Sequence, residues 1–137
     1  MGKSVKIIIV DDNQAFREGL QFYIEKALDY EVIAAYNNGE EFINGNEYLR
    51  CDIILMDIEM PIIDGIKATK LALWRSRNLK IIAITGFQEK AYLTELIGAG
   101  CKGCVFKDNV YEELEDAIHQ VMNGKLYYPG NIRLQNS

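Results

Sequence analysis

Short runs of apolar residues recur along the chain, separated by longer stretches in which apolar positions have helical spacing. Five of the short runs are rich in β-branched residues, and we expect each to form a strand: 5–10, 31–36, 52–56, 80–85 and 103–106. Several are apolar almost continuously, which is typical of strands that are buried on both faces of a sheet. The pattern therefore predicts parallel strands that are covered by helices on both sides.

The stretches between and after these strands predict helices. The clearest is the last, in which apolar residues recur at every third or fourth position: Leu114, Ala117, Ile118, Val121 and Met122. Asn109 and Glu112 form a capping-box sequence before it, and Gly124 marks its end. The first helix gathers a similar apolar face from Phe16, Leu20, Tyr23, Ile24, Ala27 and Leu28. Less regular helices are expected at 39–49, 64–76 and 88–98.

The alternation of strands and helices defines the expected fold class. Five β-α units with right-handed crossovers make an α/β, doubly wound five-stranded parallel sheet with helices on both faces. We expect the strand order 2-1-3-4-5, as in flavodoxin-like folds. In such sheets ligands bind beyond the carboxyl ends of the strands, near the switch point between the first and third strands. The residues at the strand ends are therefore the candidates for function.

Composition and charge narrow the class of protein. The chain has 137 residues, of which 49% are hydrophobic and 26% charged, which suits one globular domain with a substantial core. Its net charge of -5 and its scattered basic residues argue against direct DNA binding. Apolar runs such as 7–10 are too short to span a bilayer, and the first residues lack a signal-peptide pattern. We expect a cytoplasmic protein without membrane association.

The cysteines fit a reducing compartment. There are three, Cys51, Cys101 and Cys104, and an odd count argues against a disulfide framework. Cys101 and Cys104 form a C-x-x-C, yet they precede an apolar strand, whereas a redox pair opens a helix, and no second ligand pair completes a zinc site. We interpret them as buried or half-buried thiols.

Polar residues stand at the ends of four predicted strands: Asp11, Asp12, Asp57, Thr85 and Lys107. Each alone has a simpler explanation, such as helix capping or a turn, so it is their shared location that indicates a site. Three carboxylates close together repel one another and raise one another's pKa unless a divalent cation keeps them ionised. An all-oxygen set suits Mg²⁺ or Mn²⁺.

This geometry gives Asp57 a chemical role. A carboxylate can attack a phosphoryl group to form an aspartyl-phosphate when fixed cations neutralise the phosphoryl oxygens. The metal on one side and Lys107 on the other would supply those cations, and the Thr85 hydroxyl can donate to another phosphoryl oxygen. We therefore expect Asp57 to be a nucleophile.

Four motifs, in this order and spacing, resemble the receiver domain of two-component response regulators over roughly residues 4–124. They are IIVDDN at 8–13, LMDIEMPIIDG at 55–65, IAITG at 82–86 and CVFKD at 104–108. The resemblance implies that Asp57 is the phosphoacceptor, Thr85 the switch hydroxyl and Lys107 the phosphate-pairing lysine. It also implies that Asp12, Asp57 and the backbone carbonyl of Glu59 bind Mg²⁺ directly, with Asp11 acting through water.

The sequence departs from the receiver pattern at one position. Receivers usually carry Tyr or Phe three residues before the lysine, an aromatic that moves inward when the hydroxyl residue closes on the phosphate, and this chain has Cys104 there. Phosphorylation chemistry should survive this change, whereas coupling to the outer surface is either weakened or retained. Glu59 is interpreted as either a tuner of dephosphorylation or simply an exposed residue, and His119 as a surface residue.

The resemblance also implies partners and an output surface. A sensor histidine kinase or a phosphotransfer protein would donate the phosphoryl group, and the added charge would draw Thr85 inward and shift loop 86–90 and helix 88–98. The surface formed by the fourth helix, fifth strand and fifth helix often makes homodimers or binds an effector in this family. Here it would include Lys90, Tyr92, Lys102, Tyr111 and Glu115.

The C-terminal residues suggest the domain organisation. We assign 1–124 to a receiver domain and 125–137 to a linker or tail. The segment 123–137 resembles the connection to a C-terminal helix-turn-helix module in a transcription-factor branch of the family, although that effector domain is absent from this chain. Either the chain is a fragment of a transcription regulator, which would bind DNA as a dimer through the missing module, or it is a stand-alone receiver.

Two other functions fit the sequence less well. A Mg²⁺-dependent phosphohydrolase with an aspartyl-phosphate intermediate would have D-x-D-x-T after the strand, whereas residues 57–61 read DIEMP. A degenerate receiver that only binds proteins would be expected to lose the acidic pair, Asp57 or Lys107, and all are present. The expected protein is thus a signalling switch that catalyses only its own phosphoryl transfer and autodephosphorylation.

Overall fold

A five-stranded, wholly parallel sheet forms the centre of the molecule, as the computed structural model shows for residues 4–86 and 90–129. Its strands lie in the order β2-β1-β3-β4-β5, which confirms the predicted topology. The bounds are β1 Lys6–Val10, β2 Glu31–Tyr36, β3 Ile53–Asp57, β4 Ile81–Thr85 and β5 Gly103–Phe106. The central strands β3 and β4 are buried along their whole length, as their continuous apolar runs predict.

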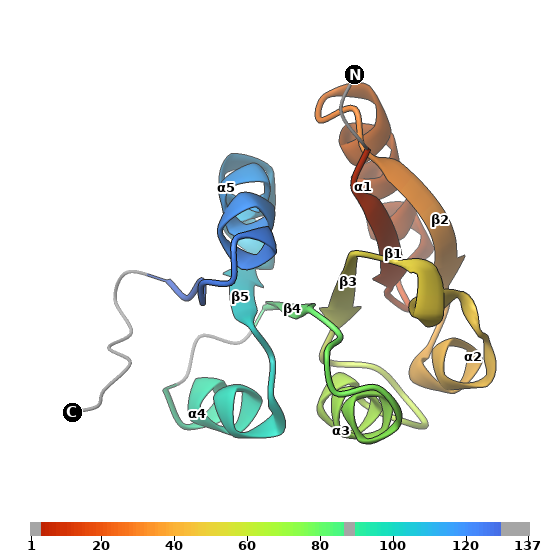
Figure 1. Ribbon diagram of the computed structural model, residues 1–137, viewed down its shortest axis with the longest axis vertical. Helices are drawn as coiled ribbons and strands as arrows, with labels where there is room; N and C mark the ends of the chain where they lie inside the picture. Colours follow the sequence, from red (N-terminus) through yellow and green to blue (C-terminus); the bar gives the residue numbers. More distant parts are fainter. Residues whose placement is uncertain (1–3, 87–89, 130–137) are drawn as a thin grey trace.

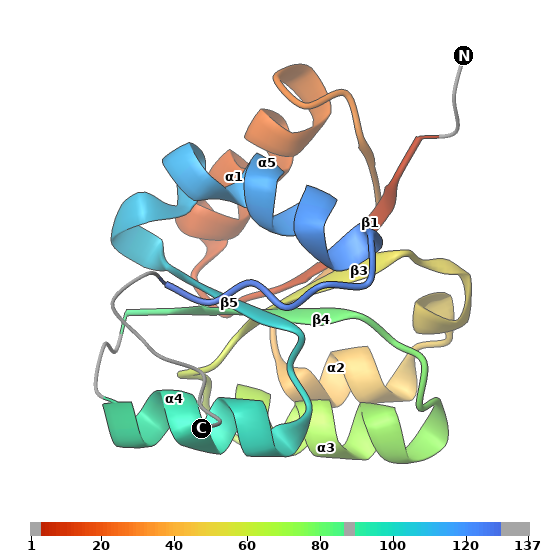
Figure 2. The same cartoon turned by 60° about the vertical axis from the view of Figure 1, so that its left-hand side comes forward.

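Helices cover both faces of the sheet (Figures 1 and 2). On one face lie α1 (Gln14–Lys26) and α5 (Val110–Met122), and on the other lie α2 (Gly39–Asn44), α3 (Gly65–Arg75) and α4 (Lys90–Ala99). Two core clusters result, one on each side of the sheet. Within the described residues, no helix combines the length and apolar character needed to cross a bilayer.

Two local predictions about helices were wrong. The helix expected at 39–49 ends at Asn44, because Gly45 takes an extended conformation, and a separate 3₁₀ helix, η1, follows at Glu47–Arg50. The capping box at Asn109 and Glu112 does not form. A short 3₁₀ helix, η2 (Lys107–Asn109), leads directly into α5, so the Asn109 side chain makes no capping hydrogen bond.

Other helix ends follow the sequence signals. The side chains of Asn13 and Asp64 accept backbone hydrogen bonds at the starts of α1 and α3. After α5, Gly124 has the left-handed φ of 83° that favours glycine, as expected for a residue that ends a helix. Beyond it the chain turns back toward the sheet, and Tyr127 forms a parallel bridge with Gly103 at the outer edge of β5.

Candidate functional site

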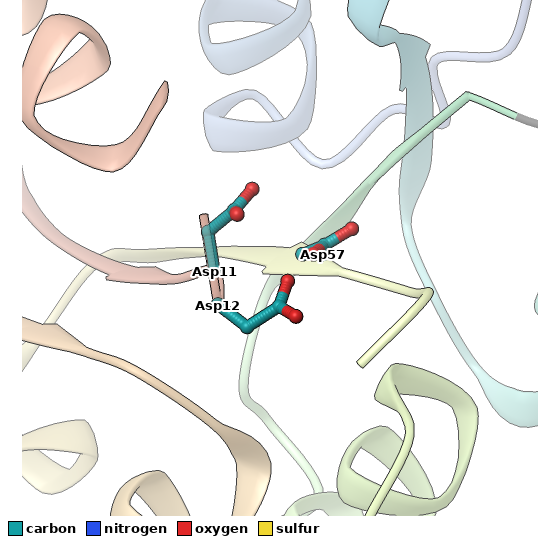
Figure 3. A group of neighbouring side chains, drawn as sticks. All are labelled: Asp11, Asp12 and Asp57. Atoms are coloured by element: carbon teal, nitrogen blue, oxygen red, sulfur yellow. The ribbon is translucent and has the colours of Figure 1, made fainter. Parts of the chain in front are cut away.

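The polar residues predicted at the strand ends gather at the carboxyl edge of the sheet. Asp57 and Thr85 are the last residues of β3 and β4, whereas Asp11 and Lys107 directly follow β1 and β5. Figure 3 shows the side chains of Asp11, Asp12 and Asp57 turned toward a common space. Because β1 pairs with β3, and β3 with β4, this clustering follows from the strand order.

Lys107 supplies the positive charge of the site. Its Nζ lies 3.4 Å from Asp11 Oδ2 and 3.5 Å from Asp57 Oδ1. Burial lowers the pKa of Lys107, but attraction to Asp57 and Asp11 outweighs it, so the net pKa is raised and the ammonium remains charged. The same Nζ lies 4.8 Å from the centroid of the Phe16 ring, a cation–π contact that the sequence did not reveal.

Asp11 is held in place by the turn that follows β1. It is 2% exposed, and its Oδ1 accepts a hydrogen bond of 2.8 Å from the backbone N–H of Asn13. The Arg17 guanidinium donates to the Asp11 carbonyl at 2.8 Å, which ties the start of α1 to the same turn. Burial raises the pKa of Asp11, while the Asn13 N–H and Lys107 lower it. Asp12, by contrast, is exposed.

Asp57 is buried without the hydrogen bonds that a buried carboxylate needs. The residue is 1% exposed, and within the described part of the chain neither side-chain oxygen accepts a hydrogen bond. Burial raises its pKa well above the ordinary value, repulsion from Asp11 raises it further, and Lys107 opposes this. An arrangement of this kind costs stability unless another group neutralises the carboxylate.

The cluster fits a small divalent cation. Asp11, Asp12 and Asp57 each offer a carboxylate oxygen, and these oxygens lie within 4.8 Å of one another. The oxygens of Asp57, which accept no hydrogen bond from the described residues, have room in their coordination for a metal ion, and the exposed Asp12 leaves the site open to water. Hard oxygen ligands together with water suit Mg²⁺, in agreement with the expectation from the sequence.

Glu59 has a contact that the sequence analysis missed. The Thr85 hydroxyl donates a hydrogen bond to Glu59 Oε2, and the Gly86 N–H lies 3.5 Å from Glu59 Oε1. Glu59 is therefore partly buried and engaged with the predicted switch hydroxyl, so the interpretation of it as simply exposed was wrong. The available signal was its position two residues after Asp57, in the loop that leaves the end of β3 toward α3.

Gly65 brings α3 close to the site. A Cβ at Gly65 would lie 2.7 Å from Ile58 Cα and would also meet the Asp57 carbonyl oxygen. Only glycine therefore allows the first turn of α3 to pack directly over the end of β3. The turn that contains Glu59 is held between these two elements, since the Gly65 N–H donates to the Ile58 carbonyl at 3.0 Å.

The thiols and the remaining predicted surface residues lie mainly as expected. Cys101 and Cys104 are free and buried, and burial raises the pKa of each thiol to about 12, which keeps it protonated and unreactive. His119 is exposed. Of the expected output surface, Lys102, Tyr111 and Glu115 are exposed. The side chains of Lys90 and Tyr92, and positions 87–89 of the predicted moving loop, lie outside the described residues.

Comparisons with known proteins identify the kind of domain. A family model described as "Response regulator receiver domain" matches residues 7–119. The transcriptional regulatory protein LnrK of Bacillus subtilis (strain 168) is 33% identical over 131 residues, which cover 96% of this chain and 60% of that protein. The transcriptional regulatory protein DegU of Brevibacillus brevis is 31% identical over 123 residues, covering 90% of this chain and 52% of that protein.

A solved structure shows the same fold. The crystal structure of a two-component response regulator of the LuxR family, from Aurantimonas sp. SI85-9A1, matches with a TM-score of 0.88 and 28% identity. The match covers 95% of this chain and 93% of that chain. Against the two curated relatives, in contrast, this chain spans only 60% and 52% of their lengths.

Proposed function

Because this chain belongs to the response regulator receiver domain family, whose members are phosphorylation-dependent switches of two-component signalling, we propose that Asp57 is its phosphoacceptor. The observation that carries this assignment is the environment of Asp57. Its carboxylate is 1% exposed and accepts no hydrogen bond from the described residues, while Lys107 lies 3.5 Å away. Such a carboxylate is costly as a structural element and well placed as a nucleophile beside a fixed cation.

Receiver domains generally bind Mg²⁺ at an acidic pocket, and this chain has one in Asp11, Asp12 and Asp57. We assign Asp12, Asp57 and the backbone carbonyl of Glu59 as direct ligands, with Asp11 acting through water. When bound there, Mg²⁺ would neutralise charge on the phosphoryl oxygens. Without the metal, burial raises the pKa of both Asp11 and Asp57, and repulsion from Asp11 raises that of Asp57 further, so the pocket favours a divalent cation that keeps both ionised.

The proposed reaction transfers a phosphoryl group from a phosphohistidine of a sensor kinase or phosphotransfer protein. A carboxylate oxygen of Asp57 attacks the phosphorus, and the O–P bond forms as the N–P bond breaks. The electron pair of the broken bond leaves on the imidazole nitrogen, which takes up a proton. Lys107 pairs with one phosphoryl oxygen and the Thr85 hydroxyl donates to another, so the negative charge of the phosphoryl group is stabilised from two sides.

Release of the phosphoryl group needs only water. Attack on the acyl phosphate breaks the bond to phosphorus and returns the Asp57 carboxylate together with inorganic phosphate. The protein thus catalyses its own phosphorylation and dephosphorylation without turning over a separate substrate. The lifetime of the phosphorylated state would depend on how well Lys107, Thr85 and Glu59 control access of water to the acyl phosphate.

We further propose that residues 1–124 are the receiver domain of a transcription regulator and that 125–137 belong to the linker to its effector. Support comes from LnrK and DegU, which are named as transcriptional regulatory proteins and are longer than this chain. DNA would be bound through the effector domain, and phosphorylation would promote homodimerisation of the receiver. The acidic net charge of -5 agrees with a receiver that does not bind DNA directly.

Intact mass spectrometry after incubation with Mg²⁺ and acetyl phosphate or phosphoramidate tests this function. We expect the native chain to gain one phosphoryl group and Asp57→Asn to gain none. Asp108→Asn is the matched control, because Asp108 is an exposed carboxylate next to Lys107 and should leave the gain intact. Failure of the native chain to gain mass, while calorimetry shows that Mg²⁺ binds, would refute the assignment of Asp57.

A further inference from the structure

The chain beyond α5 returns along the outer edge of β5 (Figure 2). The Tyr127 N–H donates to the Lys102 carbonyl at 3.0 Å, and the Cys104 N–H donates to the Tyr127 carbonyl at 2.8 Å. Tyr127 and Gly103 form a parallel bridge between these two bonds. We call residues 125–129 the docked segment, because they occupy a short sixth position at the edge of the five-stranded sheet.

Gly103 makes this close approach possible. A Cβ at this position would lie 2.8 Å from the Tyr127 carbonyl oxygen and 3.4 Å from Tyr127 Cβ. The first distance is shorter than a Cβ can tolerate against backbone, so a larger residue would push the segment away. The docked segment is thus matched to the surface of β5 and does not simply lie across it.

Two tyrosines hold the docked segment to opposite faces of the sheet. The Tyr127 hydroxyl donates to Glu113 Oε1 at 3.2 Å, and its ring packs against the core cluster beneath α1 and α5. The Tyr128 hydroxyl donates to the Cys101 carbonyl at 2.7 Å, and its ring packs against the opposite cluster, which contains Cys104. The segment therefore contacts the interior on the side where the receiver pattern expects an aromatic at position 104.

Cys104 links this segment to the phosphorylation site. It lies fully buried on β5 beside Ala83 of β4, two residues before the Thr85 end of that strand. Burial raises the pKa of the Cys104 thiol, and the Thr85 hydroxyl at the end of β4 donates a hydrogen bond to Glu59. Burial also raises the pKa of Tyr128, with further contributions from Cys101 and Cys104. Hydrogen bonds and strand pairing thus connect the docked segment to Cys104, Cys104 to β4, and the end of β4 to Glu59.

We propose that Tyr128, supplied by the C-terminal segment, provides the aromatic ring that this receiver lacks at position 104, and that it couples docking of residues 125–129 to the position of Thr85. When a phosphoryl oxygen takes the Thr85 hydroxyl from Glu59, the hydroxyl moves toward Asp57 and space opens between the site and Cys104. An unfilled space in a core is costly, so the Tyr128 ring moves inward to fill it. The docked segment is then held more firmly.

This coupling rests on the proposed phosphorylation of Asp57, and hydrogen exchange can test the two separately. The backbone N–H of Cys104 reports docking directly, because its partner is the Tyr127 carbonyl. In the native chain we expect Mg²⁺ with beryllofluoride, a phosphoryl mimic, to slow exchange at Cys104 by at least about tenfold. In Tyr128→Ala, exchange should be about tenfold faster at rest and unaffected by beryllofluoride.

Tyr127→Phe is the matched control, since it loses only the bond to Glu113 on the other face and should keep the response. The double variant Cys104→Phe with Tyr128→Ala restores an aromatic side chain on β5 itself. In this variant Thr85 should again move in response to beryllofluoride, although residues 125–129 are no longer docked. A native response in Tyr128→Ala would overturn the role of Tyr128. If Asp57 took up a phosphoryl group while the exchange rate of the Cys104 N–H stayed the same, the coupling alone would be overturned. If Asp57 took up no phosphoryl group, the proposed function on which the coupling rests would be overturned.

Discussion

The Thr85 hydroxyl donates a hydrogen bond to the Glu59 carboxylate across the carboxyl edge of the sheet. The same hydroxyl is the donor that we assign to a phosphoryl oxygen, so Glu59 and the phosphoryl group compete for it. Under the proposed mechanism, Glu59 would stabilise the resting position of Thr85 and slow the change that phosphorylation requires. The loop between β3 and α3 would then contribute to the switch as well as to the metal site.

Removing the carboxylate of Glu59 should speed phosphorylation. In Glu59→Gln the hydrogen bond to Thr85 loses its charge assistance, which is worth about 1 kcal/mol, so we expect the initial rate with acetyl phosphate to rise several-fold. Time-resolved intact mass measures this rate. Glu112→Gln removes an equal charge from an exposed site on α5 and should have the native rate. Equal rates for native protein and Glu59→Gln would show that Glu59 does not restrain Thr85.

Asp57→Asn should stabilise the metal-free protein. Replacing the buried carboxyl group, which accepts no hydrogen bond from the described residues, with a neutral amide should raise the free energy of unfolding by about 1–3 kcal/mol near neutral pH. The pKa of Asp57 is raised on folding, so folding favours the protonated form. Stability of the native chain is then lost as pH rises from the ordinary pKa of an aspartate through the raised value, and the advantage of the Asp57→Asn variant grows over that window.

Thermal unfolding in a chelator, followed at mildly acidic and neutral pH, measures this difference. Asp108→Asn, at an exposed position, should change the free energy of unfolding by less than about 0.5 kcal/mol. If Asp57→Asn were no more stable than the native chain at neutral pH, the carboxylate would not be the strained group that its surroundings indicate.

Asp12→Asn should weaken Mg²⁺ binding by at least about tenfold, because it removes one of three converging carboxylates while leaving the fold intact. Asp12 is exposed, so this loss should come with almost no change in the stability of the metal-free protein. Isothermal titration calorimetry with Mg²⁺ measures the affinity, and Asp108→Asn again provides the control. Native affinity in Asp12→Asn would exclude Asp12 from the ligand set.

Gly65→Ala should destabilise the protein by about 1–3 kcal/mol, because a Cβ would meet Ile58 Cα at 2.7 Å and neither backbone can retreat without moving the site. Gly98→Ala is the matched control within a helix. A Cβ there has nothing within 4 Å, and alanine should leave stability unchanged or raise it by about 0.5–1 kcal/mol. Denaturant unfolding measures the free energy of unfolding of both variants. Equal values for Gly65→Ala and Gly98→Ala would show that Gly65 is not required for the close packing of α3 on the end of β3.

The fold was predictable because its signals are local and repeated. Continuous apolar runs such as the one that ends at Asp57 identify buried parallel strands, and the strand order then brings Asp11, Asp57, Thr85 and Lys107 together. The break of the helix at Gly45 and the uncapped Asn109 were not predicted, because tertiary contacts and a preceding 3₁₀ turn override local signals.

Contacts between distant segments were harder to predict than the elements. The hydrogen bond between Glu59 and Thr85 joins residues 26 positions apart, and that between Tyr128 and Cys101 joins residues 27 positions apart. Neither pair has a sequence pattern of its own, because each depends on how loops leave the sheet. The sequence showed that Cys104 replaces an aromatic, but only the structure shows that Tyr128, from the C-terminal segment, packs against the core cluster that contains Cys104.

Chemical trapping of the phosphorylated residue tests the central claim most directly. An acyl phosphate is reduced by borohydride to an alcohol, so phosphorylated aspartate becomes homoserine, whereas a free carboxylate is not reduced. After treatment with Mg²⁺, acetyl phosphate and then borohydride, peptide mapping by tandem mass spectrometry should find homoserine at position 57 and intact aspartate at positions 11, 12 and 108. Homoserine at one of those other positions, or at none despite phosphoryl uptake, would contradict the assignment of Asp57 as the phosphoacceptor.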